Sequence, residues 1–265
     1  MNGRIERKFM ELRQRNEKAL VAYITAGDPD LETTVHLLRS LESAGVDVVE
    51  IGVPFSDPTA DGPIIQAASQ RALKNGVTLA AILDMIESLR KVSQIPIILF
   101  GYYNPIFSFG NKRFAEYAKR VGVDGILVVD LPPEESKELR QFTDYEQIDF
   151  ISLIAPTSGK ERIKYISKNA QGFLYYISVT GVTGAANFYM ADIKENVENI
   201  HNITSLPLVV GFGVSTPSQA KEISAFSDGV VIGSAFVKII EENIGSKDLV
   251  KLVSSYATSI KNGLI

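Results

Sequence analysis

Two patterns of apolar and polar residues take turns along this chain. Eight short runs are nearly continuous in Val, Ile and Leu, which is typical of parallel strands buried on both faces. They predict strands at residues 20–25, 48–51, 97–101, 125–129, 150–153, 173–178, 208–211 and 229–232. Between these runs, apolar residues recur with the 3.6-residue period of an amphipathic helix. That period predicts helices at residues 31–44, 80–91, 112–121, 133–142, 160–169, 191–199 and 218–226.

The repetition of strand and helix indicates the fold class, which is α/β. Eight βα units follow one another without a linker or a low-complexity segment, so we expect a single domain over residues 1–265. Such a series predicts a (β/α)8 TIM barrel. The pattern adds a helix before the first strand, at 5–16, and two helices after the last, at 235–242 and 247–261. A doubly wound open sheet is the competing fold.

The composition excludes several classes of function. The 265 residues are 45% hydrophobic and 22% charged, which is typical of a globular protein with a large core. The formal net charge of −4 gives no basic surface for nucleic acid, and no apolar run is long enough to span a membrane. Without cysteine there are no disulfides, thiolate nucleophiles or thiolate metal sites. Because the N-terminus has no signal-peptide pattern, we expect a cytoplasmic protein.

Two carboxylates follow the second predicted strand. Glu50 interrupts an apolar run, where an unpaired charge is costly, and Asp61 comes eleven positions later after a proline-rich loop. In a (β/α)8 barrel the catalytic groups lie at the carboxyl ends of the strands. A pair of carboxylates at such an end predicts general acid–base chemistry. The simpler interpretations are an ion pair for Glu50 and a turn-forming role for Asp61.

Other catalytic groups are scarce at the predicted strand ends. His36 falls within a predicted helix and His201 precedes the seventh strand, so neither a histidine base nor a histidine metal site is expected. No predicted strand contains a lysine, which argues against Schiff-base chemistry. The groups that remain for proton transfer are Glu50, Asp57, Asp61, Asp130, Tyr102 and Tyr176.

Glycines follow the seventh and eighth strands. Gly213 precedes one predicted helix, and Gly233 with Ser234 leads into another. Glycine lets backbone N–H groups approach an oxyanion, and a helix N-terminus adds a positive dipole end, so these turns predict a phosphate site. Gly184, in the Gly-Val-Thr-Gly segment after the sixth strand, would add a further wall. The predicted cradle contains no Lys or Arg, and the simpler interpretation is a pair of strand-to-helix turns.

Aromatic residues gather near the same strand ends. They are Tyr23, Phe100, Tyr102, Tyr176 and Phe212. Each one alone is more typical of a barrel core, but together they suit a flat apolar ring beside the phosphate. Three βα segments, at 52–63, 102–111 and 179–190, are long enough to be lids or binding loops.

Motifs spread along the chain resemble those of a known family. Residues 50–63 read Glu-Ile-Gly-Val-Pro-Phe-Ser-Asp-Pro-Thr-Ala-Asp-Gly-Pro, which is similar to the most specific motif of tryptophan synthase α subunits. Further similar motifs occur in the family's order, at residues 23–29, 102–105, 181–184, 211–215 and 233–235. Two features depart from the family. Tyr23 stands where phenylalanine is frequent, and the segment 179–190 lacks the basic residues of some members.

The resemblance implies the retro-aldol cleavage of indole-3-glycerol phosphate to indole and glyceraldehyde 3-phosphate. Glu50 would shuttle a proton between indole C3 and the glycerol hydroxyl, and Asp61 would bind the indole N–H. The phosphate would be bound by Gly184, Gly213, Gly233 and Ser234. The indole would be positioned by Tyr23, Phe100, Tyr102, Tyr176, Thr183 and Phe212. Thr183 is expected to move towards Asp61 when the lid at 179–190 closes.

The resemblance also implies a partner. The chain would pair with a β subunit that carries pyridoxal phosphate, in an α2β2 complex, with residues 54–58 and 102–109 facing that subunit. No cofactor and no metal are expected in this chain. Two other functions stay open. One is a different phosphosugar barrel enzyme, which the Glu50 and Asp61 motif disfavours, and the other is a non-catalytic activator of the β subunit.

Overall fold

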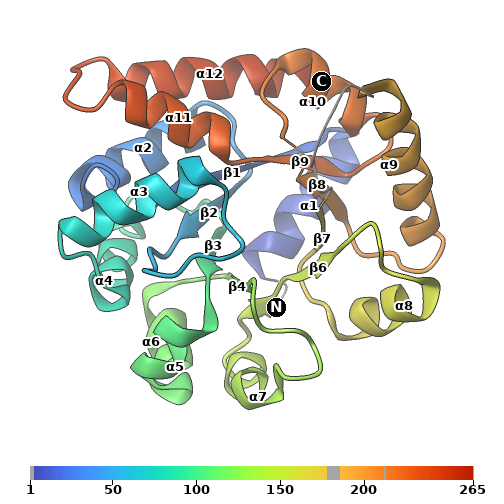
Figure 1. The fold of residues 1–265 in the computed structure, drawn as a ribbon, viewed down its shortest axis with the longest axis horizontal. Helices are drawn as coiled ribbons and strands as arrows, with labels where there is room; N and C mark the ends of the chain where they lie inside the picture. Colours follow the sequence, from blue (N-terminus) through green and yellow to red (C-terminus); the bar gives the residue numbers. More distant parts are fainter. Residues whose placement is uncertain (1–2, 178–185, 212, 265) are drawn as a thin grey trace.

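Parallel strands form one sheet at the centre of the molecule (Figure 1). The computed structural model describes residues 3–177, 186–211 and 213–264, and the strands in this part pair in the order β5-β4-β3-β2-β1-β9-β8-β7-β6. They are β1 (Ala19–Thr25), β2 (Val48–Gly52), β3 (Ile97–Gly101), β4 (Gly125–Val128), β5 (Asp149–Phe150), β6 (Ser152–Ile154), β7 (Leu174–Ile177), β8 (Leu208–Gly211) and β9 (Gly229–Ile232). Because β1 pairs with both β2 and β9, the first strand of the chain joins the last.

The two ends of this strand order are halves of one segment. β5 and β6 are separated by Ile151 alone, and β5 pairs with β4 while β6 pairs with β7. The Ile151 N–H donates to the Ile126 carbonyl at 2.9 Å, so the ladder continues across the break. The strands therefore occupy the eight positions of a closed (β/α)8 barrel. The predicted TIM barrel is confirmed, and the open-sheet alternative is wrong.

Helices surround the barrel (Figure 1). They are α1 (Arg4–Arg15), α2 (Leu31–Ser43), α3 (Pro63–Lys74), α4 (Leu79–Leu89), α5 (Tyr103–Phe109), α6 (Asn111–Val121), α7 (Lys137–Tyr145), α8 (Lys160–Asn169), α9 (Ala186–His201), α10 (Pro217–Ser224), α11 (Ser234–Glu242) and α12 (Leu249–Gly263). Side-chain caps fix some of their starts. The Asp30 carboxylate accepts the Thr33 N–H before α2, and Thr216 with Gln219 forms a capping box at α10. No helix in the described part is long and apolar enough to cross a membrane.

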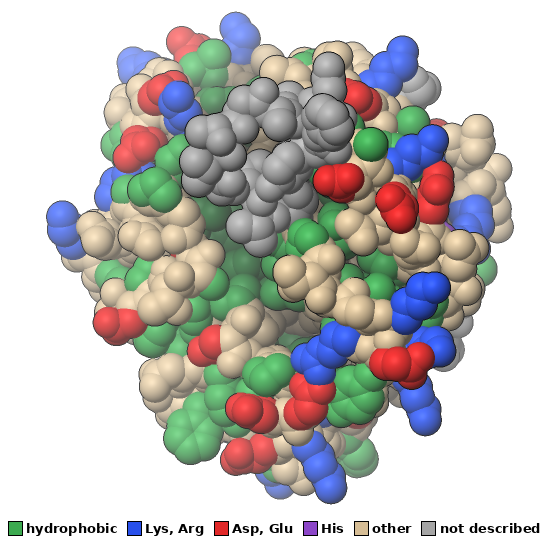
Figure 2. Space-filling view, turned by 45° about the vertical axis from the view of Figure 1, so that its right-hand side comes forward, with side chains coloured by type: hydrophobic (Ala, Val, Ile, Leu, Met, Phe, Trp, Pro, Cys, Tyr) green, Lys and Arg blue, Asp and Glu red, His purple; other side chains and the backbone are tan. Residues whose placement is uncertain are grey.

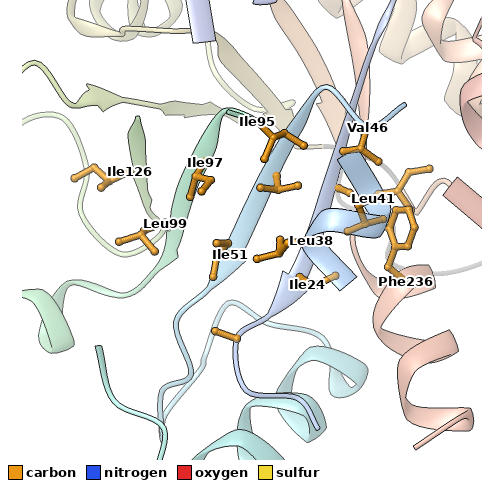
Figure 3. Close-up of a cluster of buried hydrophobic side chains, with 14 of the residues drawn as sticks. Ile24, Leu38, Leu41, Val46, Ile51, Ile95, Ile97, Leu99, Ile126 and Phe236 are labelled. Carbon is orange, nitrogen blue, oxygen red and sulfur yellow. The ribbon is translucent and has the colours of Figure 1, made fainter. Parts of the chain in front are cut away.

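Side chains alternate along each strand between two apolar layers. Outward-facing residues such as Ile24 and Ile51 pack with Leu38 and Leu41 of α2 (Figure 3). Inward-facing residues such as Val21 fill the barrel. This alternation follows from the two-residue period of a strand, and it explains why the strands are apolar on both faces. A polar side chain that faces inward is therefore an exception with a local cause.

Helix α1 closes the amino-terminal end of the barrel, behind the strands in Figure 1. Its buried residues Ile5, Phe9 and Leu12 belong to the same apolar cluster as the inward-facing side chains. The Phe9 ring lies 5.4 Å from that of Phe173 on the inner wall. Apolar side chains thus fill the barrel from this end, and Glu50 and Tyr23 lie towards the carboxyl ends of β2 and β1.

Two helices occupy segments that the sequence pattern leaves as loop. Residues 102–111 contain the seven-residue α5, and α3 follows directly after Gly62. Pro63 takes the first helical position of α3, where its fixed φ is favourable and its missing N–H costs nothing. The predicted helix 133–142 begins later, as α7, because the Ser136 hydroxyl donates to the Pro133 carbonyl in a preceding turn.

Candidate active site

A cavity of about 370 Å³ lies at the carboxyl ends of the barrel strands. Its walls come from strands β1, β2, β3, β7, β8 and β9 and from the starts of α3 and α11. The lining residues are Tyr23, Glu50, Ile64, Ile65, Phe100, Tyr175, Gly211, Gly213, Val214, Ser215, Val231, Gly233, Ser234, Ala235 and Lys238. Figure 2 shows hydrophobic side chains in the hollowed centre of this face. A larger cavity of about 580 Å³ lies under α1 at the opposite end, away from the candidate chemistry.

Glu50 lies on the wall of the cavity without a hydrogen-bond partner among the described residues. Its side chain is 1% exposed, and neither carboxyl oxygen has a partner. The ion-pair interpretation therefore finds no support in the described part. Burial raises the pKa of Glu50 to about 8, because the charged form loses its hydration. At neutral pH the side chain is mainly a protonated acid, ready to give a proton to a bound molecule.

Asp61 lies in the loop between β2 and α3, where its backbone is held from two sides. The Asp61 N–H donates to the Pro58 carbonyl at 3.1 Å, and the Gln66 side-chain amide donates to the Asp61 carbonyl at 2.8 Å. Burial raises the pKa of Asp61 to about 6, while a hydrogen bond from Tyr102 works in the opposite direction. Asp61 does not itself line the cavity of about 370 Å³.

Tyr102 connects this loop to the end of β3. Its buried hydroxyl accepts the Ala60 N–H at 2.9 Å, which leaves the hydroxyl proton free to donate to the Asp61 carboxylate. Its ring packs against Phe55, with 5.2 Å between the ring centroids. The two carboxylates thus have different surroundings, since Glu50 is buried without a partner and Asp61 is hydrogen-bonded.

Tyr23 is affected by the charges of both carboxylates. It faces Glu50 across the β1–β2 register, and its ring meets Phe100 edge-on at 5.2 Å. Burial is the main cause that raises the pKa of Tyr23, and the negative charges of both Asp61 and Glu50 add to it. Its hydroxyl lies where a side chain on Gly52 would stand, 2.2 Å from the position of such a Cβ. Gly52 therefore makes the room for this tyrosine.

The structure places the predicted site residue Tyr176 outside the cavity and its neighbour Tyr175 on the cavity wall. Tyr176 is 1% exposed and packs in the outer apolar layer, whereas Tyr175 lines the cavity. Consecutive strand residues face opposite sides, and two adjacent tyrosines in the sequence do not reveal which one faces inward. Phe173 supplies the missing signal, because it belongs to the inner layer and Tyr175 is two residues later. Gly211 leaves space for the Tyr175 ring, which would lie 2.4 Å from a Cβ at that position.

The predicted phosphate cradle is partly described. Gly213, Gly233 and Ser234 line one end of the cavity, and Gly233 directly precedes α11. Gly213 has a φ of +41°, in the region that favours glycine. Gly184, Thr183, Phe212 and most of the segment 179–190 lie outside the described residues. Lys238, which the sequence pattern did not place here, lines the cavity one helical turn after Ser234.

Neither the two histidines nor the candidate acids Asp57 and Asp130 line the cavity. His36 is exposed on α2, and His201 contacts Asp228 at 3.1 Å on the outside of the barrel. Asp130 accepts the Tyr103 N–H at 2.8 Å, and Asp57 accepts the Ser56 hydroxyl at 2.5 Å. Within the described residues, no group of His, Asp or Glu side chains is arranged to hold a metal ion.

Known proteins resemble this chain over its whole length. A family-wide sequence model described as "Tryptophan synthase alpha chain" matches residues 9–263. The tryptophan synthase alpha chain of Desulfatibacillum aliphaticivorans is 49% identical over 257 residues, which cover 97% of each chain. That of Geobacter sp. (strain M21) is 50% identical over 263 residues, which cover 99% of this chain and 98% of the relative. The chain belongs to the tryptophan synthase alpha-chain family.

Solved structures agree with this membership. Tryptophan synthase subunit alpha from Legionella pneumophila str. Paris superposes with a TM-score of 0.93 at 37% identity, over 100% of this chain and 99% of that chain. The Mycobacterium tuberculosis tryptophan synthase structure gives a TM-score of 0.90 at 30% identity, over 100% of this chain and 99% of that chain. The barrel and its cavity therefore belong to an alpha chain of tryptophan synthase, a lyase.

In this alpha chain an arginine ties the two halves of the site together. Arg71 of α3 donates from Nε and Nη2 to the buried Asp28 carboxylate, both at 2.8 Å, and from Nη1 to Glu241 of α11 at 2.7 Å. α3 follows Asp61 directly, and α11 begins at the phosphate cradle. Bidentate pairing of this kind fixes orientation as well as distance. The contact therefore links α3, which follows the Asp61 loop, to α11, whose first residues line the cavity.

Proposed function

We propose that Glu50 and Asp61 are the catalytic pair with which this tryptophan synthase alpha chain cleaves indole-3-glycerol phosphate. The family function is the cleavage of that substrate and the transfer of indole to a beta subunit. The observation that carries the assignment is the buried, unpartnered carboxyl of Glu50 in a cavity that ends in glycine turns. A buried polar group without a partner is costly, and a substrate that hydrogen-bonds to it removes that cost.

The retro-aldol reaction needs one acid and one base that act in turn. Protonated Glu50 gives its proton to C3 of the indole ring, and positive charge develops at the ring nitrogen. The resulting carboxylate then takes the proton of the glycerol hydroxyl on the carbon attached to C3. As that C–O bond becomes a carbonyl, the bond between C3 and this carbon breaks and its electrons return to the ring. Indole and glyceraldehyde 3-phosphate leave, and Glu50 is protonated again.

The two pKa values suit this division of labour. At pH 7, a pKa of about 8 leaves Glu50 mainly protonated, and a pKa of about 6 leaves Asp61 mainly ionised. The Asp61 carboxylate accepts the indole N–H and stabilises the positive charge that develops there. The indole ring itself takes up the electrons, so the residues described here suffice for each proton transfer.

The phosphate end of the substrate is assigned to Gly213, Gly233 and Ser234. Backbone N–H groups at the start of the nine-residue helix α11 point towards an anion bound there, and the helix dipole favours negative charge. The apolar walls formed by Ile64, Ile65 and Phe100 suit the indole ring between this end and Glu50. Gly184 and Thr183, outside the described residues, remain predicted members of the site.

The partner is proposed to be a beta subunit that holds pyridoxal phosphate, in an α2β2 complex in the cytoplasm. Phe107 on α5 is 56% exposed, a large apolar side chain beside the end of the cavity-forming strand β3. Exposed aromatic residues are enriched in interfaces between proteins. Phe107 supports a partner surface at residues 102–109, as the family motif there suggests.

One experiment separates this assignment from its alternatives. Indole release from indole-3-glycerol phosphate is measured for the wild type, Glu50→Gln and Asp61→Asn, each with and without a beta subunit. We expect the wild type to release indole in both conditions and both variants to lose most of the activity. Near wild-type release by Glu50→Gln would refute the assignment. No release by any form, with normal activation of the beta subunit, would identify a non-catalytic activator.

A further inference from the structure

The proposed substrate brings a phosphate dianion into a protein that repels it. The chain has a net charge of −4, and Glu50 is the one acidic side chain among the described residues that line the cavity. Backbone N–H groups supply partial charges only, so a dianion gains from a nearby cation. Among the described residues that line the cavity, Lys238 is the one basic side chain. This cation was absent from the cradle that the sequence predicts.

Helix geometry directs Lys238 towards the cradle. It lies four residues after Ser234 on α11, so the two side chains share a face of the helix one turn apart. Side chains on a helix lean towards its N-terminus. Lys238 lines the same cavity as Gly233 and Ser234, so a change of side-chain rotamer away from Glu242 would turn its ammonium group towards them.

The ammonium group of Lys238 makes only a weak ion pair with another residue. Its Nζ lies 3.8 Å from Glu242 Oε1, and the two side chains are 60% and 59% exposed. An exposed pair at this spacing contributes little, typically ~0.3–0.5 kcal/mol. A phosphate dianion in the cradle carries about twice the charge of that carboxylate at neutral pH, so it competes effectively for the ammonium.

We propose that Lys238 is a phosphate-binding residue of this site, which exchanges Glu242 for the phosphate monoester of the substrate. This inference rests on the proposed function, because it takes the glycine-lined end of the cavity as the phosphate end. The ligand class is a phosphate monoester on a short polyol chain. Lys238 acts on binding and recruitment of the substrate, and the proton transfers at the other end of the cavity proceed without it.

The test uses sn-glycerol 3-phosphate as the probe and the full chain as the protein. Binding is measured by titration calorimetry for the wild type, Lys238→Met, Lys238→Arg and the control Lys251→Met on α12. Methionine keeps the length and helix propensity of the stem while it removes the charge. We expect Lys238→Met to weaken binding about tenfold, the scale of one charge-assisted contact, and Lys238→Arg to keep most of the affinity. Lys251→Met should bind like the wild type.

Salt provides a second readout that a purely structural role would not change. Screening weakens an ammonium–phosphate attraction, and the Debye length shortens about fivefold between 0.02 and 0.5 M salt. The wild-type affinity should therefore fall more steeply over this range than that of Lys238→Met. Binding by Lys238→Met within twofold of the wild type, with the same salt dependence, would overturn the inference. So would an equal loss in Lys251→Met.

Turnover distinguishes a failure of this inference from a failure of the proposed function. With indole-3-glycerol phosphate, Lys238→Met should raise KM about tenfold and leave kcat within twofold. If Glu50→Gln loses turnover and Lys238→Met leaves KM unchanged, the catalytic assignment stands and the role of Lys238 is wrong. If the wild type does not bind glycerol phosphate and Glu50→Gln keeps wild-type turnover, both are wrong.

Discussion

Replacing Glu50 by Gln should inactivate the enzyme and stabilise its fold at the same time. The amide has nearly the size of the carboxyl group and cannot exchange protons, so turnover should fall at least about a hundredfold, the usual scale of general acid–base catalysis. The stability gain follows from burial. Glu50 is 1% exposed, and both of its carboxyl oxygens lack a hydrogen-bond partner among the described residues.

The size of that gain depends on pH. The folded-state pKa of about 8 exceeds the unfolded value of 4.5, so between these values the folded state binds more protons. Stability is therefore lost as the pH rises through this window. The linkage relation makes the cost of Glu50 about 1 kcal/mol at pH 5, about 3 kcal/mol at pH 7 and about 5 kcal/mol at pH 9.

Urea unfolding followed by circular dichroism measures this difference directly. The free energy of unfolding of Glu50→Gln relative to the wild type should rise by about 4 kcal/mol between pH 5 and pH 9. Glu87→Gln, an exposed change on α4, is the matched control and should show no such trend. A difference that stays constant with pH would refute the reasoning, because it would mean that Glu50 is not held as a buried neutral acid.

Three further variants test other parts of the site. Asp61→Asn should lower turnover strongly and leave glycerol phosphate binding intact, since only the charge facing the indole nitrogen is lost; an equal loss of binding would move Asp61 to the phosphate end. Tyr102→Phe removes the hydroxyl that lowers the pKa of Asp61, so the acid limb of the pH–rate profile should move to higher pH; an unmoved limb contradicts the contact. Gly233→Val should raise KM and spare the fold, because a Cβ there meets Tyr23 only at 3.5 Å; unchanged phosphate affinity would place the phosphate elsewhere.

The barrel could be predicted from the sequence because its signal repeats. Each strand is apolar on both faces and is followed by an amphipathic helix, so eight independent segments point to one topology. The segments that were misread have weak local signals. α5 is seven residues long and rich in aromatic residues, and α3 begins inside a proline-rich motif whose chemistry masks its helical period.

Within the site, the sequence could predict candidate residues but not the direction in which each side chain faces. Glu50 is a candidate because a carboxylate is exceptional in an apolar strand. Tyr176 was predicted and Tyr175 was not, because a local pattern does not fix which face of a strand is inward; the apolar layers and the cavity of the folded barrel do. Lys238 was missed because its place depends on where α11 lies relative to the cavity, which is a property of the tertiary structure.

The pairing of β1 with β9 has a consequence for how the protein is made. Glu50 and Asp61 belong to the first quarter of the chain, whereas Gly213, Gly233 and Ser234 belong to the last. During synthesis the acid–base residues leave the ribosome long before the segment that closes the barrel beside them. The cavity that holds Glu50 is also lined by Tyr175, Gly211 and Val231, so its wall is complete only when the last strand pairs with the first. The surroundings that raise the pKa of Glu50 are therefore assembled together with the closed barrel.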